Sequence, residues 1–347
     1  MRFVLLLLLS LLDCAAGCRS NSTHFVWKAW EDDADESSGL NASPQQQQQQ
    51  QLRELEEQDC LYQTREDAAK AAAEFLRKNV MAFDLGKLET LGFGSDSSVD
   101  VDGLSFGIVQ PTVELALDAK ANHTWTDDLP QSIFFEYVLN YANTNEARTN
   151  WRPLLTPKVE TILANAAGPV TTVETVVELL NTHIWTAIAP KHVDSIVFVS
   201  GQTPVIYDPM SVMAFGYASC TGLATLFTNV LRSAGVAARV VGTAAWYGDR
   251  NQGNHNWVEV YSQGQWYFLE PSPSAGFVDT IHRNPCDRWF CSKDRFNYTN
   301  RTTRVYAARL DQEKAQTMYY PLAWQWDSTD VPGVDQSKYY AEICSKC

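Results

Sequence analysis

The spacing of apolar positions predicts a helix near the middle of the chain. Its apolar residues recur with the spacing of a single helix face: Leu223, Leu226, Phe227, Val230 and Leu231. Ser219 precedes this stripe as an N-cap residue, and Gly235 follows it where a helix commonly ends. We therefore expect a helix between Ser219 and Gly235 that packs its apolar face on a core.

Short β-type runs follow this helix. Residues 237–243 are rich in alanine and valine and predict a strand. After a loop rich in glycine and asparagine, residues 255–261 and 266–270 predict two further strands. The turn 262–265 between them contains a glycine, as a β-hairpin requires.

The chain before residue 190 is predicted to be mainly helical. Three segments carry apolar residues at helical spacing: 68–80, 132–142 and 173–188. Thr64 with Asp67 is typical of the start of the first helix, and Pro153 and Pro157 predict a break between the other two. Helices followed by a hairpin predict an α+β fold, in which the central helix packs on an antiparallel sheet.

Residues 1–17 have the pattern of a signal peptide, with a positive charge at Arg2, an apolar run over 3–12 and small residues after it. The run is too short to span a bilayer, and no later stretch predicts a membrane span. We therefore expect a secreted protein. The alternative is a bacterial lipobox over 15–18 that would lipidate Cys18.

Residues 18–58 are predicted to be disordered, because they combine an acidic, serine-rich stretch with a polyglutamine run. The folded region is expected over 59–347. Hydrophobic residues make up 45% of the chain, which is enough to build a core. The net charge of −14 would repel phosphate backbones, so we expect no nucleic-acid partner.

Cysteines and glycosylation motifs support export. Removal of Cys14 with the signal peptide leaves seven of the eight cysteines, an odd number. Cys220 is isolated in the middle of the chain, so we expect a free thiol there and three disulfides among the others: Cys18, Cys60, Cys286, Cys291, Cys344 and Cys347. The alternative is a zinc site built from the last four. Five N-x-Ser/Thr motifs fit a glycoprotein: Asn21, Asn41, Asn122, Asn297 and Asn300.

We expect no metal or cofactor. Asp96, Asp100 and Asp102 lie in a loop that resembles a calcium loop, but the spacing lacks the closing glutamate of an EF-hand.

Cys220 lies in the first turn of the predicted central helix. The positive end of the helix dipole and the unpaired backbone N–H groups there stabilise a thiolate and lower the pKa of the thiol. A small buried apolar side chain is the alternative interpretation of a cysteine at this position.

The hairpin brings His255 and Glu270 together. If Ser262 and Gln263 form its tip, Glu270 lies opposite His255; if Gln263 and Gly264 form it, Glu270 lies opposite Trp257 on the same face. Both registers place the carboxylate within reach of the imidazole. Cys220, His255 and Glu270 are therefore candidates for nucleophile, base and orienting acid.

These residues resemble the transglutaminase-like superfamily. The match is carried by YASCTGLATLFTNVLRSAGVAARVVG and NHNWVEVYSQGQWYFLEP, over about residues 205–275. The resemblance implies a papain-like core at about residues 160–280, with a helical part before it and a disulfide-pinned extension after it. It differs at Glu270, where the superfamily usually has aspartate.

The resemblance implies acyl transfer on protein or peptide amides through a cysteine thioester. A peptidase or amidase with the same residues, and an inactive binding module on the same fold, are the alternatives. The Cys220 N–H is the expected first donor to the oxyanion, and Trp185 or Trp246 is a candidate for the second. Trp257, Trp266 and Phe268 are expected in the core.

Overall fold

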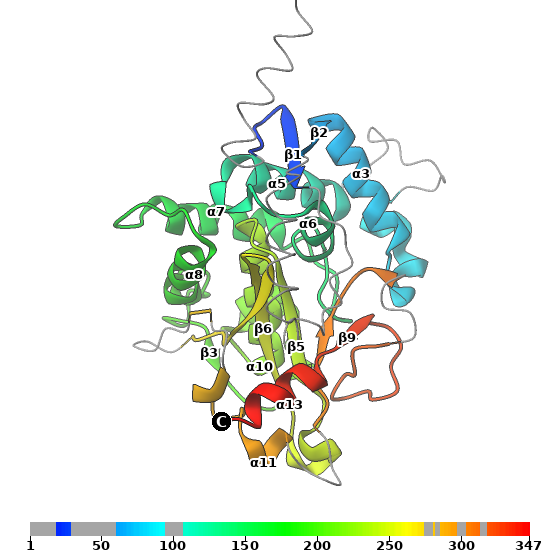
Figure 1. The fold of residues 1–347 in the computed structure, drawn as a ribbon, viewed down its shortest axis with the longest axis vertical. Coiled ribbons are helices and arrows are strands. Elements are labelled where there is room, and N and C mark those ends of the chain that lie inside the picture. Colours follow the sequence, from blue (N-terminus) through cyan, green and yellow to red (C-terminus); the bar gives the residue numbers. More distant parts are fainter. Residues whose placement is uncertain are drawn as a thin grey trace, which may run out of the picture.

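The computed structural model describes residues 19–28, 60–93, 107–273, 280–281, 285–296, 303–312 and 318–347 (Figure 1). The predicted signal peptide, the polyglutamine run and the aspartate-rich loop lie outside the described residues. Among those described, no helix is long and apolar enough to cross a membrane.

The helices and strands follow one another along the chain. The helices are α3 (Arg65–Lys78), α4 (Leu88–Leu91), α5 (Val109–Asn122), α6 (Gln131–Tyr137), α7 (Arg152–Ala164), α8 (Val173–Ala187), α9 (Pro209–Phe215), α10 (Cys220–Ser233), α11 (Lys293–Phe296) and α13 (Ser337–Cys344). The strands are β1 (His24–Lys28), β2 (Cys60–Thr64), β3 (Val197–Phe198), β4 (Tyr217–Ala218), β5 (Ala238–Thr243), β6 (His255–Ser262), β7 (Gln265–Leu269), β8 (Tyr306–Ala308) and β9 (Gly333–Asp335).

The largest sheet has the strand order β7-β6-β5-β8-β9, and every neighbouring pair in it is antiparallel. Helix α10 packs against β5 and β6, and α5, α7, α8 and α9 contact its other sides. In Figure 1, α3, α5 and α6 lie toward one end of the long axis, while α11 and α13 lie toward the other. The structure therefore has the predicted α+β class, with the central helix on an antiparallel sheet.

Helix α10 is buried on all sides. Its apolar stripe is in the core, as predicted, and so are Thr225, Asn229 and Arg232 on its polar side. Asn229 and Arg232 have hydrogen-bond partners from other elements, as buried polar groups require. Asn143 donates to the Asn229 side chain at 2.8 Å, and Arg232 donates to the Ala142 carbonyl at 2.7 Å.

Two predictions of local structure are wrong. Within the stretch predicted to be disordered, β1 pairs antiparallel with β2, because Phe25 and Trp27 on β1 bury their rings completely. Helix α7 runs through Pro153 and Pro157, where a break was expected. Pro153 lies in the first turn, where an N–H has no helical partner, and Pro157 removes a single helical hydrogen bond.

The C-terminal part joins residues of β5, β6 and β7 in a second apolar cluster. Phe290, Phe296 and Tyr340 pack in this cluster with Trp257 and Phe268. Two disulfides pin it, Cys286–Cys347 and Cys291–Cys344. The extension is therefore disulfide-pinned, as predicted.

Candidate active site

Cys220 is the first residue of α10. Ser219 has the extended backbone of an N-cap residue, but its side chain does not cap the helix and instead hydrogen-bonds to the Thr203 hydroxyl. The first-turn N–H groups are therefore left without that side-chain acceptor, and the Cys220 thiol lies at the positive end of the helix.

The hairpin register places Glu270. Gln263 and Gly264 form the tip, with Ser262 opposite Gln265. Both tip residues have positive φ, 50° and 81°, which glycine adopts freely. Glu270 directly follows the last residue of β7, so the second of the two predicted registers is present.

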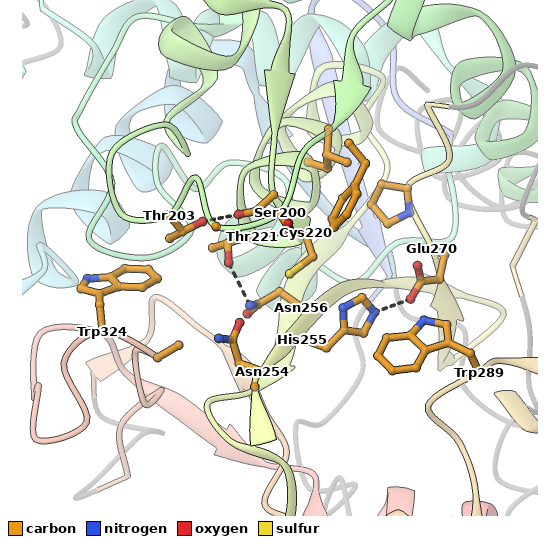
Figure 2. Close-up of a pocket in the computed structure, with 17 residues that line it drawn as sticks. Ser200, Thr203, Cys220, Thr221, Asn254, His255, Asn256, Glu270, Trp289 and Trp324 are labelled. Atoms are coloured by element: carbon orange, nitrogen blue, oxygen red, sulfur yellow. Dashed lines mark hydrogen bonds and ion pairs between the residues drawn. The ribbon is translucent and has the colours of Figure 1, made fainter. Parts of the chain in front are cut away.

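The three candidate residues lie in one hydrogen-bonded row. Glu270 Oε1 is 2.6 Å from His255 Nε2, and His255 also hydrogen-bonds to the Cys220 thiol. Figure 2 shows Cys220 and Glu270 on opposite sides of the imidazole. Asn181 Nδ2 donates to the Glu270 carbonyl at 3.0 Å, which fixes the backbone at the end of the hairpin.

The electrostatics of the row favour an ion pair. Burial alone would raise the pKa of the Cys220 thiol, but the hydrogen bond and charge of His255 and the backbone N–H of Asn256 bring that pKa below its ordinary value. Burial alone would lower the pKa of His255, but its hydrogen bonds to Cys220 and Glu270 raise it to about 9. Both shifts favour a thiolate beside an imidazolium over the neutral pair.

Cys220 and His255 open into a cleft of about 630 Å³ (Figure 2). Among the described residues that line it, Cys220, His255 and Glu270 are the ones with titratable side chains. Its other walls are aromatic, apolar, glycine, hydroxyl and amide groups: Phe198, Ser200, Gly201, Thr203, Ser219, Thr221, Leu223, Gly253, Asn254, Asn256, Pro271, Trp289, Ala323 and Trp324. An uncharged amide fits these walls without leaving an unpaired charge in the cleft.

Neither tryptophan that the sequence offered as an oxyanion donor lines the cleft. Trp185 is buried and donates to the Asn181 carbonyl at 3.0 Å, while Trp246 is buried in the second apolar cluster. The tryptophans that do line the cleft are Trp289 and Trp324, which the sequence analysis did not single out. The predicted core positions Trp257 and Phe268 are buried.

The C-terminal part covers one side of His255. The rings of Trp289 and Phe290 lie 5.0 and 5.3 Å from the imidazole, measured between centroids. Both residues belong to the short segment that begins at Cys286 and ends at Cys291, each of which is in a disulfide. The disulfides therefore hold this wall of the cleft in place.

Among the cysteines whose side chains the structure describes, Cys220 is the free one. Sulfur atoms of Cys286, Cys291 and Cys347 lie within 4.8 Å of one another, but these cysteines are paired in disulfides. The zinc alternative is therefore not favoured. Cys60 and Cys18 as disulfide partners stay a prediction.

Residues 165–271 match the sequence model of the transglutaminase-like superfamily. This segment is a transglutaminase-like domain. It includes Cys220, His255 and Glu270, and it lies within the range 160–280 expected from the resemblance.

Two solved structures are similar to the chain. A candidate cysteine protease from Cytophaga hutchinsonii is 17% identical, with a TM-score of 0.28, and the match covers 55% of this chain and 61% of that one. Red sea bream transglutaminase is 16% identical, with a TM-score of 0.31, and the match covers 45% of this chain and 35% of that one. No protein with a curated description matches the chain.

Proposed function

We propose that this protein is a thiol-dependent acyltransferase that acts on protein or peptide amides. The observation that carries the proposal is the row of Cys220, His255 and Glu270, hydrogen-bonded in that order and open to a cleft whose other described lining residues are uncharged. An inactive binding module would have no need of an ionised thiol that faces such a cleft, so this row favours an enzyme.

The reaction begins when the Cys220 thiolate attacks the amide carbonyl carbon and forms a tetrahedral oxyanion. We assign the first hydrogen bond to that oxyanion to the Cys220 backbone N–H, at the start of α10. The intermediate collapses, the C–N bond breaks, and the departing amine takes a proton from the His255 imidazolium. A thioester on Cys220 and a neutral imidazole remain.

The second half releases the acyl group. An incoming amine gives its proton to His255 as it attacks the thioester, and the Cys220 thiolate leaves. Throughout, Glu270 accepts from His255 Nε2 and stabilises each imidazolium. Water in place of the amine would make the same site a peptidase or amidase.

The experiment that tests this function uses glutamine-containing peptides with and without a primary amine. We expect amine incorporation by the parent protein, and none by Cys220→Ala. Release of the acid or of a shortened peptide in the presence of excess amine would identify a hydrolase instead. A folded parent protein that turns over neither kind of amide would overturn the proposal.

We also propose that the protein is secreted. Disulfides such as the two in the C-terminal part persist in oxidising compartments. Asn122, the acceptor of one N-x-Thr motif, is exposed at the end of α5. Mapping of the protein from culture medium is expected to find residues 1–17 removed and a glycan on Asn122; retention of residues 1–17 would contradict this.

A further inference from the structure

Asn256 directly follows His255, and its side chain occupies the space that a glycine leaves on the neighbouring strand. On β5, Gly242 is its partner in the register. A Cβ atom at residue 242 would come within 2.5 Å of Asn256 Oδ1 and within 2.5 Å of the His255 carbonyl oxygen. Only glycine leaves that space, so the sheet accommodates a buried amide directly beside the candidate base.

Both ends of the Asn256 amide are hydrogen-bonded. Its Nδ2 donates to Thr221 Oγ1 at 3.0 Å, in the first turn of α10 (Figure 2). Its Oδ1 accepts a hydrogen bond from the hydroxyl of Tyr320. The same residue donates its backbone N–H to Cys220. Asn256 therefore links the helix that carries the thiol to the strand that carries the imidazole.

Tyr320 comes from outside the transglutaminase-like domain. Its backbone N–H donates to the Val331 carbonyl at 2.8 Å, and its backbone lies so close to the start of β9 that a Cβ at Gly333 would lie 2.7 Å from the Tyr320 nitrogen. Its ring is buried. Burial, with a smaller effect of the Cys220 charge, raises the pKa of the hydroxyl well above its ordinary range, so the hydroxyl stays protonated and acts as a donor.

We propose that Tyr320 is a positioning residue, which acts through the Asn256 amide to hold the Asn256 backbone N–H against the Cys220 thiolate. Its hydroxyl donates to Oδ1 and so keeps Nδ2 directed at Thr221, because an amide has one accepting end and one donating end. Without that hydroxyl, Oδ1 is buried and unpaired, and the amide and its backbone shift to find another donor. The inference rests on the proposed role of Cys220 as nucleophile.

Among the described residues, three titratable groups act on the Cys220 thiol. His255 faces it from β6, Glu270 acts on it from the end of the hairpin, and Tyr320 lies near it from the C-terminal part. Removal of the Tyr320 hydroxyl leaves the first two in place. A change in thiol ionisation would therefore report the Asn256 donor.

The test compares Tyr320→Phe with Tyr319→Phe, a neighbouring residue that is 36% exposed. Alkylation of Cys220 by iodoacetamide is followed against pH, together with thermal unfolding. Because the hydrogen bond from the Asn256 N–H to the thiolate is weakened rather than lost, we expect Tyr320→Phe to alkylate about tenfold more slowly at mildly acidic pH. At high pH, where every thiol is ionised, both variants should match the parent.

An unchanged pH midpoint in a folded Tyr320→Phe protein would overturn the inference. If Tyr320→Phe does not fold, 4-aminophenylalanine and 4-methylphenylalanine at residue 320 take its place, since they have similar size and only the first donates a hydrogen bond. The amino variant should retain the parent midpoint and the methyl variant should not; equal midpoints would overturn the inference. If the parent itself shows no fast alkylation that depends on His255, the proposed function fails instead.

Discussion

The transglutaminase-like domain at residues 165–271 and the C-terminal part after residue 285 contribute to the same cleft in different ways. The domain supplies Cys220, His255 and Glu270, placed by one helix start and one hairpin. The C-terminal part supplies Trp289 and Phe290 against the imidazole and Tyr320 beneath Asn256. The proposed reacting groups are therefore placed by a local sequence pattern, while the residues packed around them come from a distant part of the chain.

The largest effect is expected inside the domain, at Glu270. Glu270→Gln keeps the size of the side chain but cannot stabilise the imidazolium, so we expect turnover to fall about a hundredfold with the fold intact. A matched control is Glu160→Gln, which alters a second histidine–glutamate pair, His123 Nε2 to Glu160 Oε1 at 2.9 Å, outside the cleft. Steady-state kinetics of both variants give the answer. Equal turnover for Glu270→Gln and the parent would place the acid elsewhere.

Glu270→Asp tests whether the backbone at the end of the hairpin suits glutamate or aspartate. The carboxylate is already 2.6 Å from His255 Nε2, so the backbone suits glutamate. We expect the shorter aspartate to leave a gap and to lower turnover, though by less than Glu270→Gln. Higher turnover in the aspartate variant would show that glutamate impairs the site.

The pH dependence of turnover reports the pKa of Cys220 and the pKa of His255 separately. Cys220 must be ionised and His255 protonated, so activity requires a pH above the lowered pKa of the thiol and is lost as pH rises through the His255 pKa of about 9. Glu270 is among the groups that raise the pKa of His255, so Glu270→Gln should move the alkaline limb to lower pH. An alkaline limb that does not move would contradict this role.

The next effect lies in the C-terminal part. Replacing both cysteines of the buried disulfide, Cys291→Ala with Cys344→Ala, opens a link between residues 53 apart and should cost about 2–5 kcal/mol of unfolding free energy. Because this disulfide holds Phe290 against His255, turnover should fall as well, by about tenfold at a temperature where the protein stays folded. Thermal unfolding and kinetics measure the two effects. Lower stability with unchanged turnover would show that the C-terminal part stabilises the protein but does not contribute to turnover.

The smallest effect concerns substrate contact. Trp324 lines the cleft and packs on Tyr207, with ring centroids 5.2 Å apart, so Trp324→Ala should raise KM a few-fold and leave kcat nearly unchanged. Trp326→Ala is the control, because Trp326 packs under Arg250 and is not among the residues that line the cleft. The same rise in KM for both variants would indicate a general loss of structure.

The sequence predicted the central helix and the hairpin because both depend on short-range spacing. It left the register open, since that depends on whether Ser262 or Gly264 joins Gln263 in the tip. The buried polar side of α10 could not be predicted, because its partners are distant; Asn143, for example, lies 86 residues from Asn229. For the same reason Trp289, Tyr320 and Trp324 went unnoticed, since no periodic pattern marks their segments.

The proposed chemistry requires Cys220 to be a free thiol that His255 ionises. Iodoacetamide alkylation at mildly acidic pH, with mapping of the labelled cysteine, tests it directly in the parent and in His255→Ala. We predict that Cys220 carries the label, that the folded parent reacts faster than the unfolded chain, and that His255→Ala loses most of that advantage. Equal rates in the two proteins, or a disulfide at Cys220 in active protein, would contradict the account.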